Sequence, residues 1–203
     1  MLITLLLNLF SLPKLLRLHF YPLFNRVLLK AHGVQVGTNI QIPGRIHWTI
    51  WGGNMCIGDN FYFSSGDGIN PLGSNLEGSI FLESGANLFI GNNVGMSSTR
   101  IWVHDSVSVG DNVKFGACVM VTDTDSHPVD YMARRCSNEG TKSKPVTIED
   151  DVWIGAHSII LKGVTIGARS IIGAGSVVTK SIPADCIAAG NPCKIIKNIT
   201  TVQ

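Results

Sequence analysis

The sequence predicts an all-β solenoid, a parallel β-helix of six-residue repeats with a short helical segment at its N-terminus. In the last third of the chain, isoleucine or valine recurs at every sixth position: Ile148, Ile154, Ile160, Ile166, Ile172 and Val178. Small or branched residues stand four positions after each of these anchors: Val152, Ser158, Val164, Ser170, Ser176 and Ile182. A strict period of six fits neither an amphipathic helix nor an alternating strand, and it is typical of repeat architectures.

Three hexapeptides form one triangular turn, so residues 148–183 are expected to make two complete coils, stacked like neighbouring strands at about 4.8 Å. A looser series with one extra residue after its second member continues the period upstream: Ile90, Met96, Val109, Phe115 and Val121. Periodicity does not fix the hand of the coil, and the general rule for parallel crossovers favours right-handed connections. Glycine follows the anchor at Gly155, Gly167 and Gly173, where we expect a turning backbone with positive φ.

The repeats indicate one continuous domain, because an array of coils has no separate cores to divide, and 45% of the residues are hydrophobic. We expect an apolar and basic helical segment over residues 1–32, the β-helix over residues 33–183 and a tail over residues 184–203. Two loops are expected to leave the coils, near residues 64–79 and 127–147. The first of them is rich in glycine and proline and has no periodicity.

Charge and composition argue against several classes of protein. A net charge of +2 and the lack of any nucleic-acid-binding motif predict no nucleic-acid partner. The five cysteines have no C-x-x-C spacing, which favours reduced thiols in the cytoplasm. The six histidines are scattered along the chain and none are paired at ligand spacing, so we expect no metal site.

The first 30 residues are rich in leucine, carry Lys14, Arg17, Arg26 and Lys30, and are followed by no acidic residue before Asp59. Their uninterrupted apolar part, residues 1–10, is far shorter than the roughly 20 residues that span a bilayer, and a signal peptide is disfavoured because no basic leader precedes it. Two interpretations stay open. The segment is either a helix that packs on the end of the solenoid or on a partner subunit, or an interfacial helix on anionic lipid at the inner face of the membrane.

The segment between Val121 and Ile148 interrupts the regular coils, and long loops ejected from a solenoid are often functional. If the chain stays extended as far as His127, then Asp123, Asp125 and His127 share one face. Carboxylates beside an imidazole would favour its protonated form and orient its ring. The alternative is that these are solvated turn residues and a loop histidine bonded to local backbone, and the spacing alone does not decide between the two.

Two stretches resemble a known family: "SHPVD" at residues 126–130, and "KPVTIEDDVWIGAHSIILKGVTIGARSIIGAGSVVTKSIPADCIAAGNPCKII" at residues 144–196. They are similar to the bacterial hexapeptide-repeat O-acetyltransferases, in particular the galactoside and maltose acetyltransferases and their surface-polysaccharide relatives. The resemblance covers about residues 80–199. It implies a left-handed β-helix, a homotrimer with active sites between subunits, and acetyl-CoA as a co-substrate with no bound cofactor.

The resemblance also implies roles for individual residues. His127 matches the family's catalytic base, which deprotonates an acceptor hydroxyl for direct attack on the thioester, with Asp123 and Asp125 as its expected support. The implied CoA contacts are the backbone of Ala156 and Ala174, then Thr179 and Lys180, and at the phosphates Lys194 and Lys197.

The acceptor side departs from the family, because the asparagine that small-sugar acetyltransferases place near the acceptor has no clear match in "GMSSTRIWVHDS". Ser98 and Arg100 are the candidate acceptor contacts in that region. The hydrophobic start and the "DSHP" motif resemble surface-polysaccharide acetyltransferases, so we expect a saccharide acceptor in polysaccharide or glycoconjugate biosynthesis. The alternatives are a serine or other small-molecule acetyltransferase and a non-catalytic β-solenoid assembly protein.

Overall fold

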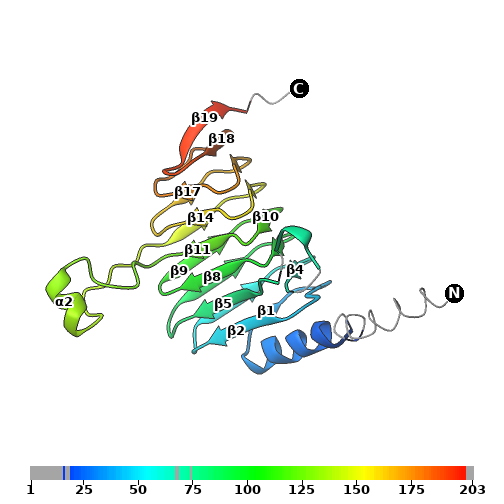
Figure 1. Cartoon of the computed structure of the whole chain (residues 1–203). Coiled ribbons are helices and arrows are strands. Elements are labelled where there is room, and N and C mark those ends of the chain that lie inside the picture. The colour runs from blue at the N-terminus through cyan, green and yellow to red at the C-terminus, as the bar shows by residue number, and fades with distance from the viewer. Residues whose placement is uncertain (1–15, 17–18, 67–68, 74, 200–203) are drawn as a thin grey trace, which may run out of the picture.

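The computed structural model describes residues 16, 19–66, 69–73 and 75–199. These residues form a left-handed parallel β-helix whose three walls are parallel sheets (Figure 1). The fold class predicted from the six-residue period, and the hand implied by the family resemblance, are confirmed. Successive coils run from the N-terminal helix at the base to the C-terminal strands at the top.

Each coil contributes one short strand to each wall. The first sheet contains β1 (Gln35–Val36), β3 (Asn54–Ile57), β6 (Asn87–Ile90), β9 (Ser106–Val109), β12 (Val146–Ile148) and β15 (Thr165–Ile166). The second contains β4 (Tyr62–Ser64), β7 (Gly95–Ser97), β10 (Lys114–Ala117), β13 (Trp153–Ile154), β16 (Ile171–Ile172), β18 (Cys186–Ala189) and β19 (Lys194–Asn198). The third contains β2 (Ile46–Ile50), β5 (Gly78–Leu82), β8 (Arg100–Val103), β11 (Met120–Thr122), β14 (Ile159–Ile160) and β17 (Val177–Val178). A short 3-10 helix, Pro71–Gly73, lies between β4 and β5.

The repeat anchors fill the interior of the helix. All six anchors between Ile148 and Val178 are at most 1% exposed, and the series four residues later is buried as well. The three serines of that second series are satisfied by backbone carbonyls; Ser158 Oγ, for example, donates to Gly155 O at 2.8 Å. The interior therefore accepts small hydroxyl side chains beside branched apolar ones, because each hydroxyl finds an acceptor in the wall.

The expectation for the repeat glycines was wrong. Gly155, Gly167 and Gly173 do not have positive φ. Positive φ instead falls on the third residue after each of the first five anchors: Asp151, His157, Gly163, Arg169 and Gly175. The glycine directly after the anchor is needed for a different reason, namely close contact between coils. A Cβ on Gly155 would lie 2.8 Å from both Ala174 Cα and Ile172 O of the next coil. A side chain at that position would push two stacked strands apart.

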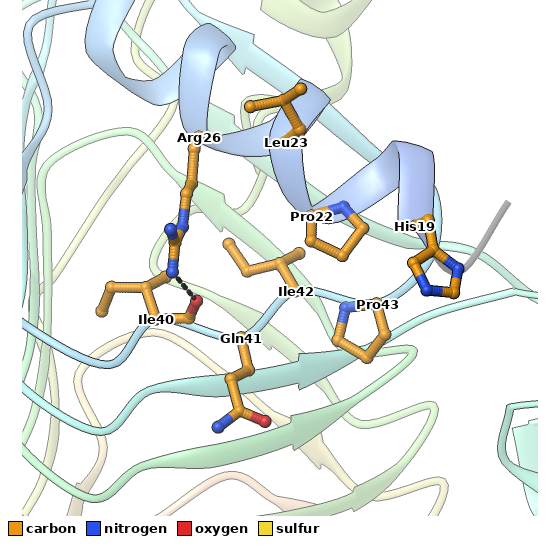
Figure 2. A pocket seen from close by; sticks show the side chains of 8 residues that line it. All are labelled: His19, Pro22, Leu23, Arg26, Ile40, Gln41, Ile42 and Pro43. Atoms are coloured by element: carbon orange, nitrogen blue, oxygen red, sulfur yellow. Dashed lines mark hydrogen bonds between the residues drawn. The ribbon is translucent and has the colours of Figure 1, made fainter. Parts of the chain in front are cut away.

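The N-terminal helix, which includes residues 19–31, lies against the first coil and covers the end of the core. Leu29 and Asn25 are buried, and the Asn25 amide donates to Ile42 O and Gly44 O at 3.1 and 3.0 Å. Figure 2 shows Arg26 reaching from the same helix to Ile40 O, at 3.0 Å. No helix in the described part of the chain is long and apolar enough to cross a membrane.

The C-terminal segment adds two strands at the top of the second sheet. β18 pairs parallel with β16, and β19 pairs antiparallel with β18. An antiparallel strand reverses the chain and ends the succession of parallel coils at this end of the solenoid.

Candidate active site

A long loop leaves the third sheet after Thr122 and returns to the first sheet at Val146. It carries the short helix α2 (Tyr131–Cys136) and projects away from the coils (Figure 1). Its base is held as a narrow antiparallel pair, because Lys144 N donates to Asp123 O at 2.9 Å and Asp125 N donates to Lys142 O at 3.1 Å. The residues nearest the coils are therefore fixed by backbone hydrogen bonds, although the arm as a whole extends outward.

His127 lies at this base and its side chain is exposed to solvent. Its Nδ1 is 3.0 Å from the side-chain oxygen of Asn138, on the returning half of the loop. An amide oxygen only accepts, so this contact is a hydrogen bond when Nδ1 carries the proton. Nε2 then presents its lone pair and is free to take a proton from another molecule. Asn138 was missed by sequence reasoning, since it lies in a part of the loop without any repeat.

Neither aspartate expected beside His127 directs its carboxylate to that ring in the single chain. The strand β11 ends at Thr122, so the extended run does not reach His127. The Asp123 carboxylate is buried and accepts the backbone N–H groups of the turn at residues 104–106, at 2.7 to 2.8 Å. Asp125 pairs with Lys162, with Oδ2 and Nζ 3.0 Å apart. Support of His127 by these carboxylates stays a prediction.

Burial raises the pKa of Asp123 above the usual range of an aspartate, and its three backbone N–H donors oppose that rise. The donors belong to the turn that follows β8, one coil before the loop. Asp123 thus ties the start of the loop to the neighbouring coil, and it fixes the backbone on which His104 sits.

A chain of polar side chains runs beside the loop base. Ser143 Oγ and His104 Nδ1 are 3.0 Å apart, and His104 Nε2 is 3.7 Å from Glu83 Oε2. The other oxygen of Glu83 accepts the indole N–H of Trp102 at 2.8 Å. These contacts join the returning half of the loop to the outer face of the third sheet, and sequence reasoning did not predict them.

The structure separates the two candidate acceptor residues. Arg100 lies on the outer face of the third sheet and lines a groove of about 590 Å³ together with Phe81, Trp102, Met120 and Ser126. Ser126 directly precedes His127, so this groove reaches the loop base. Ser98 is buried at the corner before β8, where its N–H donates to Ser64 O at 2.8 Å, and it does not line the groove.

The candidate CoA residues fall into three groups. Ala156 and Ala174 follow β13 and β16 at the corner between the second and third sheets, where Gly175 N donates to Ala156 O at 2.8 Å. Thr179 and Lys180 follow β17, at the other ends of the strands of the third sheet. The His127 loop leaves the third sheet on the same side, after β11. The remaining two lysines, Lys194 and Lys197, are exposed on β19. Among the described residues, no cluster of histidine, cysteine or carboxylate side chains could hold a metal ion.

Comparison with known proteins adds independent information on the repeats. A family model described as bacterial transferase hexapeptide (six repeats) matches residues 145–180. The galactoside O-acetyltransferase of Escherichia coli (strain K12) is 42% identical over 125 residues, which are 61% of this chain and 60% of that protein. The chain therefore matches less than two thirds of that relative's length.

Two solved structures have the same fold over most of the chain. A galactoside acetyltransferase in complex with coenzyme A has a TM-score of 0.50 at 32% identity, and the match covers 76% of this chain and 64% of that one. The polySia specific acetyltransferase NeuO has a TM-score of 0.56 at 27% identity, with 84% and 78% covered.

Proposed function

We propose, from the similarity of its repeat coils to the bacterial transferase hexapeptide repeats and to galactoside acetyltransferases, that this protein transfers an acetyl group from acetyl-CoA to a hydroxyl group of a saccharide. The observation that carries the proposal is the position of His127. It lies at the fixed base of the ejected loop and its Nδ1 contacts Asn138, while its Nε2 forms no hydrogen bond with any residue that the structure describes.

In the reaction, Nε2 of His127 removes the proton of the acceptor hydroxyl as its oxygen attacks the thioester carbonyl carbon. The new C–O bond forms, the C–S bond breaks, and the imidazolium returns the proton to the departing thiolate of CoA. A general base of this kind typically contributes a factor of about 10² to 10⁴ to the rate. The bond to Asn138 keeps the ring in the tautomer that this step requires, and backbone N–H groups of the coil wall would stabilise the tetrahedral oxyanion.

The donor site is assigned to the C-terminal coils. The backbones of Ala156 and Ala174 would contact the pantetheine arm, Thr179 and Lys180 would lie along it, and the lysines of β19 would meet the phosphates. In one chain, Ala156 lies at the corner before the strands of the third sheet begin, and His127 lies beyond the corner where they end. Packing of three subunits around a threefold axis would bring one subunit's loop edge beside the next subunit's alanine corner. This geometry supports a homotrimer with its active sites between subunits.

A saccharide acceptor is supported by the names of the similar proteins, which include galactoside and polySia acetyltransferases. We assign the reaction to surface-polysaccharide or glycoconjugate biosynthesis in the cytoplasm. A serine or other small-molecule acetyltransferase is the alternative. The groove beside His127, which is lined by Phe81 and Trp102, favours the saccharide over it. A non-catalytic solenoid would have no use for a histidine held by Asn138 with one nitrogen free.

The N-terminal helix supports a location at the membrane surface. One side of this helix is pinned to the first coil by Asn25 and Leu29. Its other side exposes Phe20, Leu23 and Val27 by about three fifths of their surface. Because no acidic residue precedes Asp59, this apolar stripe suits shallow insertion among anionic lipids. The helix would then serve both as a cover of the core and as a peripheral membrane contact.

The test of the proposed function is acetyl transfer by purified full-length protein, measured by mass spectrometry with acetyl-CoA and a panel of saccharides. His127→Ala should lower turnover at least a hundredfold at saturating acceptor while folding and CoA binding stay unchanged. His32→Ala removes another exposed histidine, at the end of the N-terminal helix, and is the matched control. Retention of turnover by His127→Ala would remove this residue from the mechanism.

A further inference from the structure

Three aromatic rings stand in a row on the outer face of the third sheet. The Trp51 and Phe81 ring centroids are 4.8 Å apart, and the Phe81 and Trp102 centroids are 5.7 Å apart. The rings come from three successive coils, directly after β2, in β5 and in β8. Trp51 is 61% exposed and Trp102 is 37% exposed, with Phe81 half-buried between them. The row therefore runs along the solenoid axis and is open to solvent in the single chain.

The row is held in place rather than left to move freely. Phe81 and Trp102 are direct partners in the parallel pairing of β5 with β8. Successive rings meet edge to face, with interplanar angles of 69° and 71°, the arrangement that aromatic quadrupoles favour. The indole N–H of Trp102 is fixed by Glu83, which also lies next to His104. A preorganised aromatic surface binds a ligand with little further loss of side-chain entropy.

The row leads directly to the candidate catalytic base. Phe81 and Trp102 line the same groove as Arg100 and Ser126, and Ser126 is the residue directly before His127 in the sequence. Trp51 extends this apolar surface by one more coil, away from the loop. The coil of Trp51 and the coil of β11 are three coil steps apart, which is about 14 Å at the usual strand spacing. That length is several times the length of one sugar ring.

We propose that the row Trp51, Phe81 and Trp102 is a binding platform for a saccharide chain of several units, whose end to be acetylated lies at His127. The C–H faces of sugar rings are apolar and pack on aromatic side chains, while their hydroxyl groups need polar partners at the rim. Arg100 and Glu83 supply such partners beside the rings. The platform rests on the proposed function, and it specifies the acceptor as an oligomer or polymer rather than a single sugar.

The matched variants are Phe81→Ala, Trp51→Ala at the exposed end of the row, and Phe89→Ala as control. Phe89 is a 49% exposed phenylalanine on β6, in a different wall of the solenoid.

Acetyl transfer is measured with malto-, galacto- and sialo-oligosaccharides of one to six units. In the wild type, KM should fall as the chain grows. Phe81→Ala should raise KM for a six-unit acceptor at least tenfold, and Trp51→Ala should raise it less. The KM for acetyl-CoA should stay unchanged in both variants. The single-sugar rate should stay unchanged in Trp51→Ala, because Trp51 lies outside the groove beside His127. Phe89→Ala should match the wild type.

Binding of the same oligosaccharides without acetyl-CoA is measured by tryptophan fluorescence, and this second readout separates the platform from the chemistry. Length-dependent quenching without any acetyl transfer would keep the platform and refute the proposed function. Absence of length dependence in both measurements would overturn the platform. Light scattering measures the oligomeric state of each variant. Loss of the oligomer in Phe81→Ala but not in Phe89→Ala would show that the row is a subunit interface, and this result would also overturn the proposal.

Discussion

Replacement of Asp123 by asparagine separates a structural from a catalytic role of this buried carboxylate. In the structure, Oδ1 accepts the N–H of His104, and Oδ2 accepts the N–H groups of both Asp105 and Ser106. An asparagine side chain has one acceptor oxygen and one NH₂ group. In its better orientation the oxygen would take the place of Oδ2, and the NH₂ group would face the N–H of His104. At least one backbone donor would lose its partner and meet another donor.

The cost follows from that count. A donor left without a partner in a buried site costs about 1–3 kcal/mol, and bonds to a charged acceptor lie at the upper end of hydrogen-bond strengths. We therefore expect Asp123→Asn to lower the free energy of unfolding by about 2 kcal/mol. For a chain of this size, that loss corresponds to a fall in Tm of about 4–8 °C.

The assay is thermal unfolding followed by circular dichroism, with Asp105→Asn as the matched control. Asp105 lies two residues after the end of β8 and is exposed. Its carboxylate accepts no hydrogen bond within the described part of the chain. Its replacement should leave Tm within about 1 °C of the wild type, as expected for an exposed surface change. Equal Tm values for the two variants, together with a large loss of turnover only in Asp123→Asn, would refute the structural role and restore the support of His127 predicted from the spacing.

Three further expectations concern the coils, the donor site and the N-terminal helix. Gly155→Ala should destabilise the protein by several kcal/mol because its Cβ meets backbone, whereas Gly175→Ala, with positive φ but open space, should cost about 1 kcal/mol in chemical denaturation. Lys194→Glu combined with Lys197→Glu should raise KM for acetyl-CoA more than KM for the acceptor, with a smaller effect at high salt; unchanged CoA affinity in calorimetry would make these lysines merely solvated. Deletion of residues 1–30 should abolish cosedimentation with anionic liposomes and, because Leu29 and Asn25 cover the core, should also lower Tm; binding that survives the deletion contradicts the membrane contact.

The fold was predictable because the interior of a narrow β-helix accepts few side chains. A position that points inward on every coil tolerates only branched or small residues. Ile154 and Ile172 pair directly in β13 and β16, and the period is visible in the sequence because both are branched. The glycines carried the same period and were still misinterpreted. Sequence spacing shows that a side chain is excluded at Gly155, but it does not distinguish a strained φ from a neighbouring coil that leaves no room.

The side-chain contacts beside the site could not be predicted in the same way, because the coils there are irregular in length. Phe81 pairs with Trp102, and Trp102 with Thr122, at intervals longer than three hexapeptides. The interval between Trp51 and Phe81 is longer still, since it includes the excursion after β4. Without a constant coil length, the sequence does not show which outward residues stack, and the aromatic row and the contact of His104 with Glu83 stay hidden.

The alternation of residues along β11 predicts that the side chain of Asp123 points into the solenoid. Val121 and Asp123 share one face of the chain by the period of two, and both are fully buried. An aspartate on the inward face of a strand needs hydrogen-bond donors in the interior, since burial of an unpaired carboxylate is very costly. The nearest donors in a parallel β-helix are the backbone N–H groups of the turn one coil earlier, which are free wherever the chain bends out of the sheet. The inward position of Asp123 thus predicts the contacts with residues 104–106 on physical grounds, and it argues against a carboxylate that turns outward to meet the exposed ring of His127.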